Sequence, residues 1–106
     1  MTTFDKREEA FEKKFVIDEE LRFKAVARRN RMLGMWAAEK LGKSGTDAQT
    51  YAKDVVVAEF DGGDAGVIAK VMGDLAALGV ASSEDELRIK MDEWMARSIA
   101  EIKAGM

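Results

Sequence analysis

Residues 18–42 read "DEELRFKAVARRNRMLGMWAAEKLG", and this stretch decides the fold because it carries apolar side chains on two opposite faces of one helix. At about 100° per residue the apolar positions separate into two sets. The first set is Leu21, Ala25, Met32 and Trp36, and the second is Phe23, Ala27, Leu33, Ala37 and Leu41. Two apolar faces indicate a central helix with a neighbour on each side, or one face reserved for a partner. Gly42 is the expected C-cap.

Two further helices are predicted after this one. In "GKSGTDAQTYA", Thr46 is expected to be an N-cap, with Gln49 completing a capping box, so a helix should span about 47–60. Its predicted stripe is Ala48, Tyr51, Ala52 and Val55, with Val56 and Phe60 at the margins. After the linker "DGGDAG", Asp64 is expected to cap a third helix that Gly79 closes. Its apolar positions are Val67 or Ile68, Val71, Met72, Leu75 and Leu78.

A fourth helix starts after "SSEDEL", with Ser83 as N-cap and Glu86 as its capping-box partner, and ends at Gly105. One side of it carries Leu87, Met91, Trp94, Met95, Ser98 and Ile102. The run "KDVVVAEF" has β-branched residues, but the preceding capping box and the helical spacing favour helix over strand. These patterns predict an all-α protein, a small antiparallel four-helix bundle over residues 18–106.

Composition excludes several kinds of function. A chain of 106 residues suits one core, and its net charge of −3 argues against a nucleic-acid or membrane-surface binder. The absence of Cys and His removes the thiolate nucleophiles and the commonest metal ligand and general base, so we expect no catalytic and no metal site. Without a membrane span or signal peptide, the expected location is the cytoplasm, and the free protein is expected to be a monomer.

The N-terminal stretch "FDKREEAFEKKF" sets three phenylalanines into a run of charge. On a helix, Phe4, Phe11 and Phe15 fall within roughly 40° of one another and form one seam, here called the phenylalanine seam. An apolar seam of this kind needs a surface to cover it. That surface belongs either to the rest of this chain or to another protein.

The "ARRNR" run places Arg28, Arg29 and Arg31 within four positions. Guanidinium groups bind phosphate and carboxylate through a fork of donors. The three arginines could therefore pair with the acidic half of this chain, bind a partner's carboxylates, or bind a nucleotide. "AAEKLGKS" lacks the first glycine of a phosphate loop and continues a helix, so it is not a second nucleotide site.

The runs "TTFDKREEAFEKKF", "DEELRFKAVARRNRMLGMWAAEKLG" and "YAKDVV" resemble the zeta subunit of alphaproteobacterial rotary ATP synthases, an ATPase-inhibitor family. The family motif A-R-R-N-R-x-L-G-x-W-A-A-E-x-L-G matches residues 27–42 at every fixed position. The resemblance extends over essentially the whole chain.

This resemblance implies an inhibitor of ATP hydrolysis and not an enzyme. It implies a four-helix bundle with a mobile N-terminal segment, residues 1–17. This segment is implied to insert at a catalytic interface of the alpha and beta subunits, near the gamma rotor, and to become helical on binding. The implied contact residues are Phe4, Arg7, Phe11, Lys13, Lys14 and Phe15, with Arg28, Arg29 and Arg31 as a second, partner-binding or phosphate-binding group. No cofactor is implied apart from weak ATP or ADP binding at an unassigned site. The alternative is a nucleotide-responsive helical module that uses the arginines.

Overall fold

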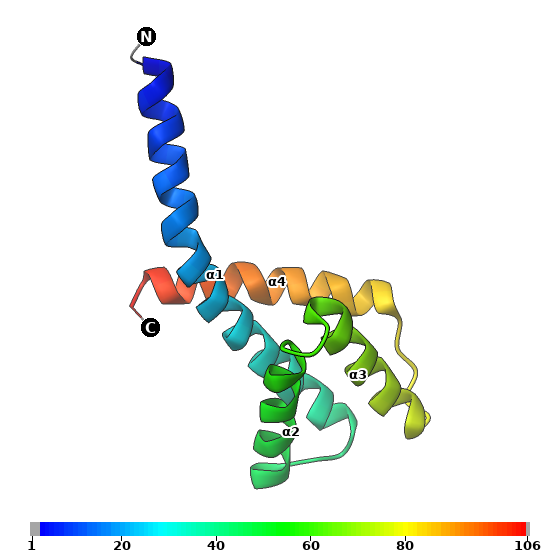
Figure 1. The fold of residues 1–106 in the computed structure, drawn as a ribbon. Coiled ribbons are helices and arrows are strands. Elements are labelled where there is room, and N and C mark those ends of the chain that lie inside the picture. Colours follow the sequence, from blue (N-terminus) through cyan, green and yellow to red (C-terminus); the bar gives the residue numbers. More distant parts are fainter. Residues whose placement is uncertain (1–2, 106) are drawn as a thin grey trace.

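The computed structural model contains four α-helices and, over residues 3–105, no strand. It describes the backbone of residues 3–105 and the side chains of residues 19–105. The helices are α1 (Thr3–Lys40), α2 (Gly45–Ala58), α3 (Gly63–Ala77) and α4 (Glu84–Lys103) (Figure 1). The all-α, four-helix prediction is confirmed, and the run "KDVVVAEF" contributes its first six residues to α2.

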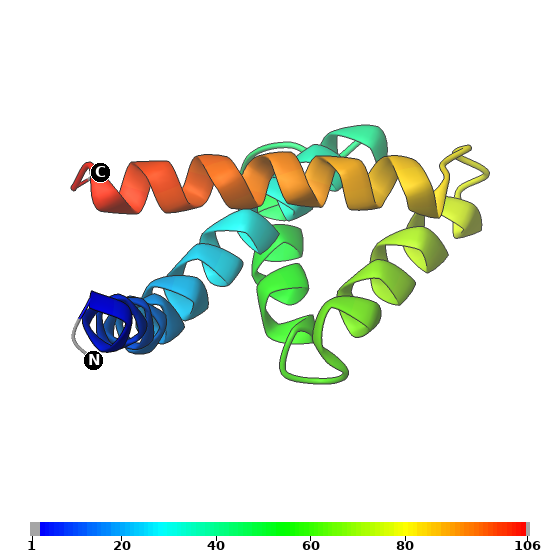
Figure 2. The same ribbon diagram turned by 90° about the horizontal axis from the view of Figure 1, so that it is seen from above.

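The C-terminal part of α1 is the centre of the fold, because α2, α3 and α4 all pack against it. On one face the Trp36 ring lies edge-on to Trp94 of α4, with ring centroids 5.9 Å apart. On the other face Gly34 lies so close to α2 that a Cβ there would meet the Ala52 Cα at 2.5 Å. The two-faced pattern of α1 therefore reflects two neighbours within the chain, and Figures 1 and 2 show the helices crossing obliquely.

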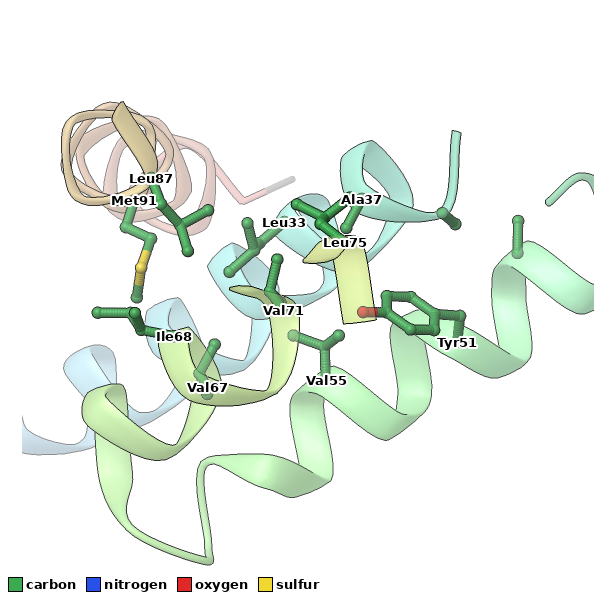
Figure 3. Packing of buried hydrophobic residues seen from close by; sticks show 12 residues of the cluster. Leu33, Ala37, Tyr51, Val55, Val67, Ile68, Val71, Leu75, Leu87 and Met91 are labelled. Atoms are coloured by element: carbon green, nitrogen blue, oxygen red, sulfur yellow. The ribbon is translucent and has the colours of Figure 1, made fainter. Parts of the chain in front are cut away.

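All four helices contribute to one apolar core (Figure 3). Its buried members are Leu33, Ala37, Ala38, Ala48, Tyr51, Val55, Val67, Ile68, Val71, Leu75, Leu87 and Met91. The predicted stripe of α2 is buried as expected. Leu78 is 62% exposed, so its prediction as a core residue of α3 is wrong. Among the described residues no helix is long and apolar enough to cross a membrane.

The predicted ends of α1 and α3 are confirmed. At the end of α1 the Gly42 and Lys43 amides donate to the carbonyls of Glu39 and Ala38, and Gly42 has φ +76°. This is the Schellman arrangement, in which glycine takes the left-handed conformation at little cost. Gly79 and Val80 repeat it at the end of α3, where their amides donate to the carbonyls of Ala76 and Leu75.

Of the three predicted N-caps, Thr46, Asp64 and Ser83, only Ser83 is correct. The Ser83 hydroxyl accepts a hydrogen bond from the Glu86 amide at 3.1 Å. The N-cap of α2 is Ser44 and not Thr46, because the Ala48 amide already donates to the Ser44 carbonyl. The N-cap of α3 is Gly62 and not Asp64, whose carboxylate is bound elsewhere.

Candidate partner-binding site

The first group of predicted contact residues belongs to the N-terminal segment. Its members are Phe4, Arg7, Phe11, Lys13, Lys14 and Phe15. Their side chains lie outside the described residues, since the structure describes side chains only from residue 19 onward. Their roles therefore stay predictions.

The second group, the three arginines of the "ARRNR" run, does not form one patch. The Arg28 guanidinium is half-buried and forms an ion pair with Glu101 of α4 at 3.4 Å. Arg29 is only 5% exposed and lies among acidic groups, whereas Arg31 is exposed. Helical spacing separates their directions by about 100° per residue, so one arginine faces α4, one faces the connection between α2 and α3, and one faces solvent.

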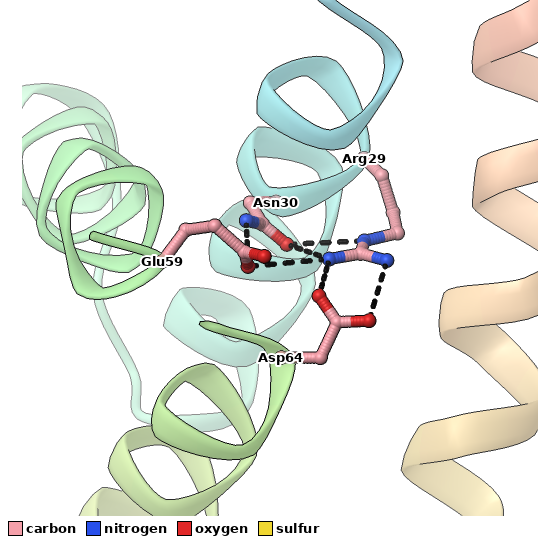
Figure 4. A network of polar contacts seen from close by, with 4 residues as sticks. All are labelled: Arg29, Asn30, Glu59 and Asp64. Atoms are coloured by element: carbon pink, nitrogen blue, oxygen red, sulfur yellow. Dashed lines mark hydrogen bonds and ion pairs between the residues drawn. The ribbon is translucent and has the colours of Figure 1, made fainter. Parts of the chain in front are cut away.

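The surroundings of Arg29 form a polar network that joins three helices (Figure 4). Its Nη2 donates to Asp64 Oδ1 at 2.7 Å, and its Nη1 donates to Asp64 Oδ2 at 3.3 Å. Nη2 also donates to Glu59 Oε2 at 3.4 Å, and both Nε and Nη2 donate to the Asn30 side-chain oxygen. The Asn30 amide group in turn donates to Glu59 Oε2 at 2.9 Å. A guanidinium buried in this way needs such partners, because an unpaired buried charge is strongly destabilising.

The connection between α2 and α3 places both carboxylates against this guanidinium. Glu59 is the C-cap of α2, and Asp64 lies in the first turn of α3. Between them, Gly62 and Gly63 have φ values of +102° and +64°. Residues with a Cβ rarely adopt this region, so the glycine pair permits the tight reversal that brings the two acids together.

The two carboxyl groups respond to this environment in opposite directions. Burial raises the pKa of Glu59, and the neighbouring Asp64 carboxylate raises it further, against the opposing hydrogen bond from Asn30. The hydrogen bonds from Arg29 lower the pKa of Asp64, against the opposing effect of burial. One guanidinium thus faces two acids, and Asp64 is the one held firmly in its charged form.

This geometry gives Arg29 a structural task within the chain. To bind phosphate or a partner's carboxylate, its guanidinium would have to leave both Glu59 and Asp64. Arg29 is therefore held inside the fold, whereas Arg31 is exposed on the surface of α1. Arg28 and Arg29 pair with the acidic half of the chain, which is one of the alternatives that the sequence left open. Among residues 19–105 no group of three or more acidic side chains is arranged to hold a metal ion.

Reasoning from sequence did not identify Glu59 and Asp64 as partners of Arg29. The sequence pattern predicts Asp64 as a helix cap and assigns no role to Glu59. The available signal was the double glycine between two acids in "EFDGGDAG", which marks a tight turn that can present both to one base. No neighbouring residue in the sequence indicates which basic side chain these acids bind, since Arg29 and Asp64 are 35 positions apart.

Comparisons with known proteins agree with this architecture. The family model for ATPase inhibitor subunit zeta matches residues 1–101. A structure solved by solution NMR is 41% identical in sequence, with a TM-score of 0.69, and the match covers 81% of this chain and 99% of that one. A search of curated proteins returned no match. The matched region takes in the phenylalanine seam, the "ARRNR" run and all but the last two residues of α4, and the chain belongs to the ATPase inhibitor subunit zeta family.

Proposed function

We propose that this inhibitor acts by inserting residues 1–17 at a catalytic interface between the alpha and beta subunits of the ATP synthase, close to the gamma rotor. The family is one of regulatory proteins that are not enzymes, and it implies interaction with ATP synthase. The observation that carries the proposal is that the family match begins at residue 1 and so includes the whole charged segment with the phenylalanine seam.

The position of the core supports a separate role for this segment. Among the described residues, the buried apolar side chains lie between Ala25 and Met91. These described residues already form a core to which all four helices contribute, and we assign the phenylalanine seam to a partner's cleft. A helix of about 14 residues is marginal in water on its own, so burial of the seam in a partner's cleft would supply the stability that the isolated segment lacks.

The charges around the seam would set its register and orientation in the cleft. Arg7, Lys13 and Lys14 would meet acidic groups, while the three aromatic rings of the phenylalanine seam would be the anchors. Anchors of this kind carry most of the binding energy in helix-in-groove complexes, and flanking charges contribute mainly to specificity.

The test is inhibition of ATP hydrolysis by the cognate ATP synthase. We expect the full-length protein to inhibit and a chain that begins at residue 18 to lose inhibition while circular dichroism shows that it stays helical. Equal hydrolysis with the full-length chain, with the shortened chain and with neither would reject the proposal.

The Phe11→Ala variant separates a partner contact from a core contact. If Phe11 is a partner anchor, the Phe11→Ala variant should no longer inhibit ATP hydrolysis, and its thermal unfolding midpoint should equal that of the wild type. A lowered midpoint would mean that the phenylalanine seam packs against its own bundle, and the insertion mechanism would then be wrong.

A further inference from the structure

An exposed apolar patch lies where α1 and the C-terminal end of α2 meet. Phe23 is 64% exposed, Phe60 is 74% exposed, and their ring centroids are 6.4 Å apart. One turn before Phe60, Val57 is 61% exposed. Phe23 belongs to the second apolar face of α1, for which the sequence left open a neighbour within the chain or a partner. Its exposure leaves aromatic surface in water. Clustered exposed hydrophobic groups of this kind mark interaction sites more often than single ones do.

The patch is one end of a continuous groove between α1 and α2. A hollow of about 250 Å³ lies under the two rings and is lined by apolar groups that include Val26, Ala27 and Val56. A second hollow of about 710 Å³ adjoins it, since Ala27 and Val56 line both. Together the two hollows, here called the α1–α2 groove, extend from Phe60 to Thr46 at the start of α2.

The two ends of the α1–α2 groove differ in chemistry. The larger hollow has a basic rim made by Arg28 and Arg31 of α1 and Lys53 of α2, and the hydroxyls of Thr46 and Thr50 add hydrogen-bonding groups. Among residues 19–105, no acidic side chain lines this hollow, although the protein as a whole has a net charge of −3. The aromatic end carries both signs, through Glu19, Arg22 and Glu59.

We propose that the α1–α2 groove is a second docking surface that receives an acidic amphipathic helix of the ATP synthase head. This inference rests on the proposed function. A groove between two helices accepts the apolar face of a third, and the basic rim selects a helix whose polar face carries Asp or Glu at the corresponding end.

The position of the groove along α1 identifies this partner as the protein that holds the inhibitory segment. Phe23 follows residue 17 by six positions on the same helix, which is about 9 Å at 1.5 Å per residue. A cleft that encloses residues 1–17 would therefore lie next to the aromatic end of the groove. Engagement of both surfaces would make the second contact intramolecular and raise affinity beyond that of either alone.

The experiment compares full-length variants in inhibition of ATP hydrolysis and in binding to the isolated synthase head. The aromatic variant is Phe23→Ala with Phe60→Ala, and the matched control is Leu78→Ala with Ile89→Ala, which removes equally exposed apolar groups from α3 and α4. We expect the aromatic variant to weaken binding at least about tenfold, because aromatic anchors carry much of the binding energy of an interface. The control variant should bind as the wild type does, and all chains should keep the wild-type unfolding midpoint.

Charge reversal tests the basic end. Arg31→Glu with Lys53→Glu should weaken binding by about tenfold or more at low salt, with a smaller effect as salt rises, because it opposes like charges across the contact. Lys103→Glu, at the exposed end of α4, is the control and should have little effect. Val57→Asp provides an independent variant within the groove if the aromatic pair lowers stability.

The outcomes separate this inference from the proposed function. Loss of inhibition on deletion of residues 1–17, combined with wild-type binding by every groove variant, would overturn the docking surface and leave the insertion mechanism standing. Retained inhibition after that deletion would overturn the insertion mechanism. Sedimentation of the wild type as a dimer that Phe60→Ala dissociates would mean that the groove binds a second copy, which would also overturn the proposal.

Discussion

The Arg29 guanidinium binds both carboxylate oxygens of Asp64, at 2.7 Å from Nη2 and 3.3 Å from Nη1. This two-point contact joins the middle of α1 to the first turn of α3, and the adjoining Glu59 extends it to the end of α2. Paired donors and acceptors of this kind fix geometry as well as energy. The network therefore determines where the α2–α3 pair sits on the central helix.

Replacing Asp64 with Asn should lower the free energy of unfolding at neutral pH by about 1–2 kcal/mol, because the buried Arg29 guanidinium loses a charged partner. The loss is limited because the Asp64 side chain is itself half-exposed to water. Asp61→Asn, in the same turn and exposed, should leave stability unchanged. Urea unfolding followed by tryptophan fluorescence measures both. Equal stability of the Asp64 variant and the wild type would show that Arg29 does not depend on this contact.

The raised pKa of Glu59 predicts a pH dependence with a definite sign. A group whose pKa is higher in the folded than in the unfolded state stabilises the fold when it is protonated. For Glu59 this stabilisation is fully present below the ordinary pKa of 4.5 and is lost as the pH rises through the pKa of the folded state. Between neutrality and pH 4.5 the wild type should therefore gain stability relative to Glu59→Gln as the pH falls. Urea unfolding at several pH values measures this difference, and parallel curves for the two chains would contradict it.

Asp64 should show the opposite sign at lower pH. Its folded pKa lies below the ordinary value of 3.8, so its contribution is present above that value and is lost as the pH falls through the folded one. The stability difference between the wild type and Asp64→Asn should shrink in acid below pH 3.8. A difference that stays constant across that range would mean that the Asp64 charge is not what stabilises the network.

Two glycine substitutions should change stability in opposite directions, one at the crossing of α1 and α2 and one away from it. Gly34→Ala should destabilise by about 1–3 kcal/mol, because the new Cβ would lie 2.5 Å from the Ala52 Cα and the two helices would have to separate. Gly73→Ala, inside α3 with no atom within 4 Å of the new Cβ, should stabilise by about 0.5–1 kcal/mol through helix propensity. Thermal unfolding of the two variants provides the measurement, and a shift of the same sign in both would refute the close crossing.

The two serine N-caps should differ in their energetic importance. Ser83→Ala removes the hydrogen bond from the Glu86 amide and should lower stability by about 1 kcal/mol. Ser44→Ala should have a smaller effect, because the Ser44 side chain makes no capping hydrogen bond. Chemical denaturation of both variants checks this ranking, and a larger loss at Ser44 would reverse it.

Local patterns in the sequence were sufficient to predict the number of helices, most of their C-terminal ends and much of the core. The reason is that helical periodicity, glycine C-caps and the Ser83 cap depend on residues within one or two turns of each other. The stripe of α2 was predicted correctly for this reason. The prediction for Thr46 was wrong because Ser44, two residues earlier, is also suited to be an N-cap. The prediction for Asp64 was wrong because its carboxylate binds the Arg29 guanidinium instead of capping the helix.

By itself the sequence determined the helices, their two-faced arrangement around residues 18–42 and, through its family motif, the class of the protein. Only the tertiary structure decided that Arg29 is buried while Arg31 is exposed, that Asp64 neutralises a base 35 positions away, and that Phe23 and Phe60 stay in water. The physical reason is that periodicity defines which face of a helix is apolar, whereas the crossing points of the helices, such as Gly34 against Ala52, define how far along that face a neighbour reaches.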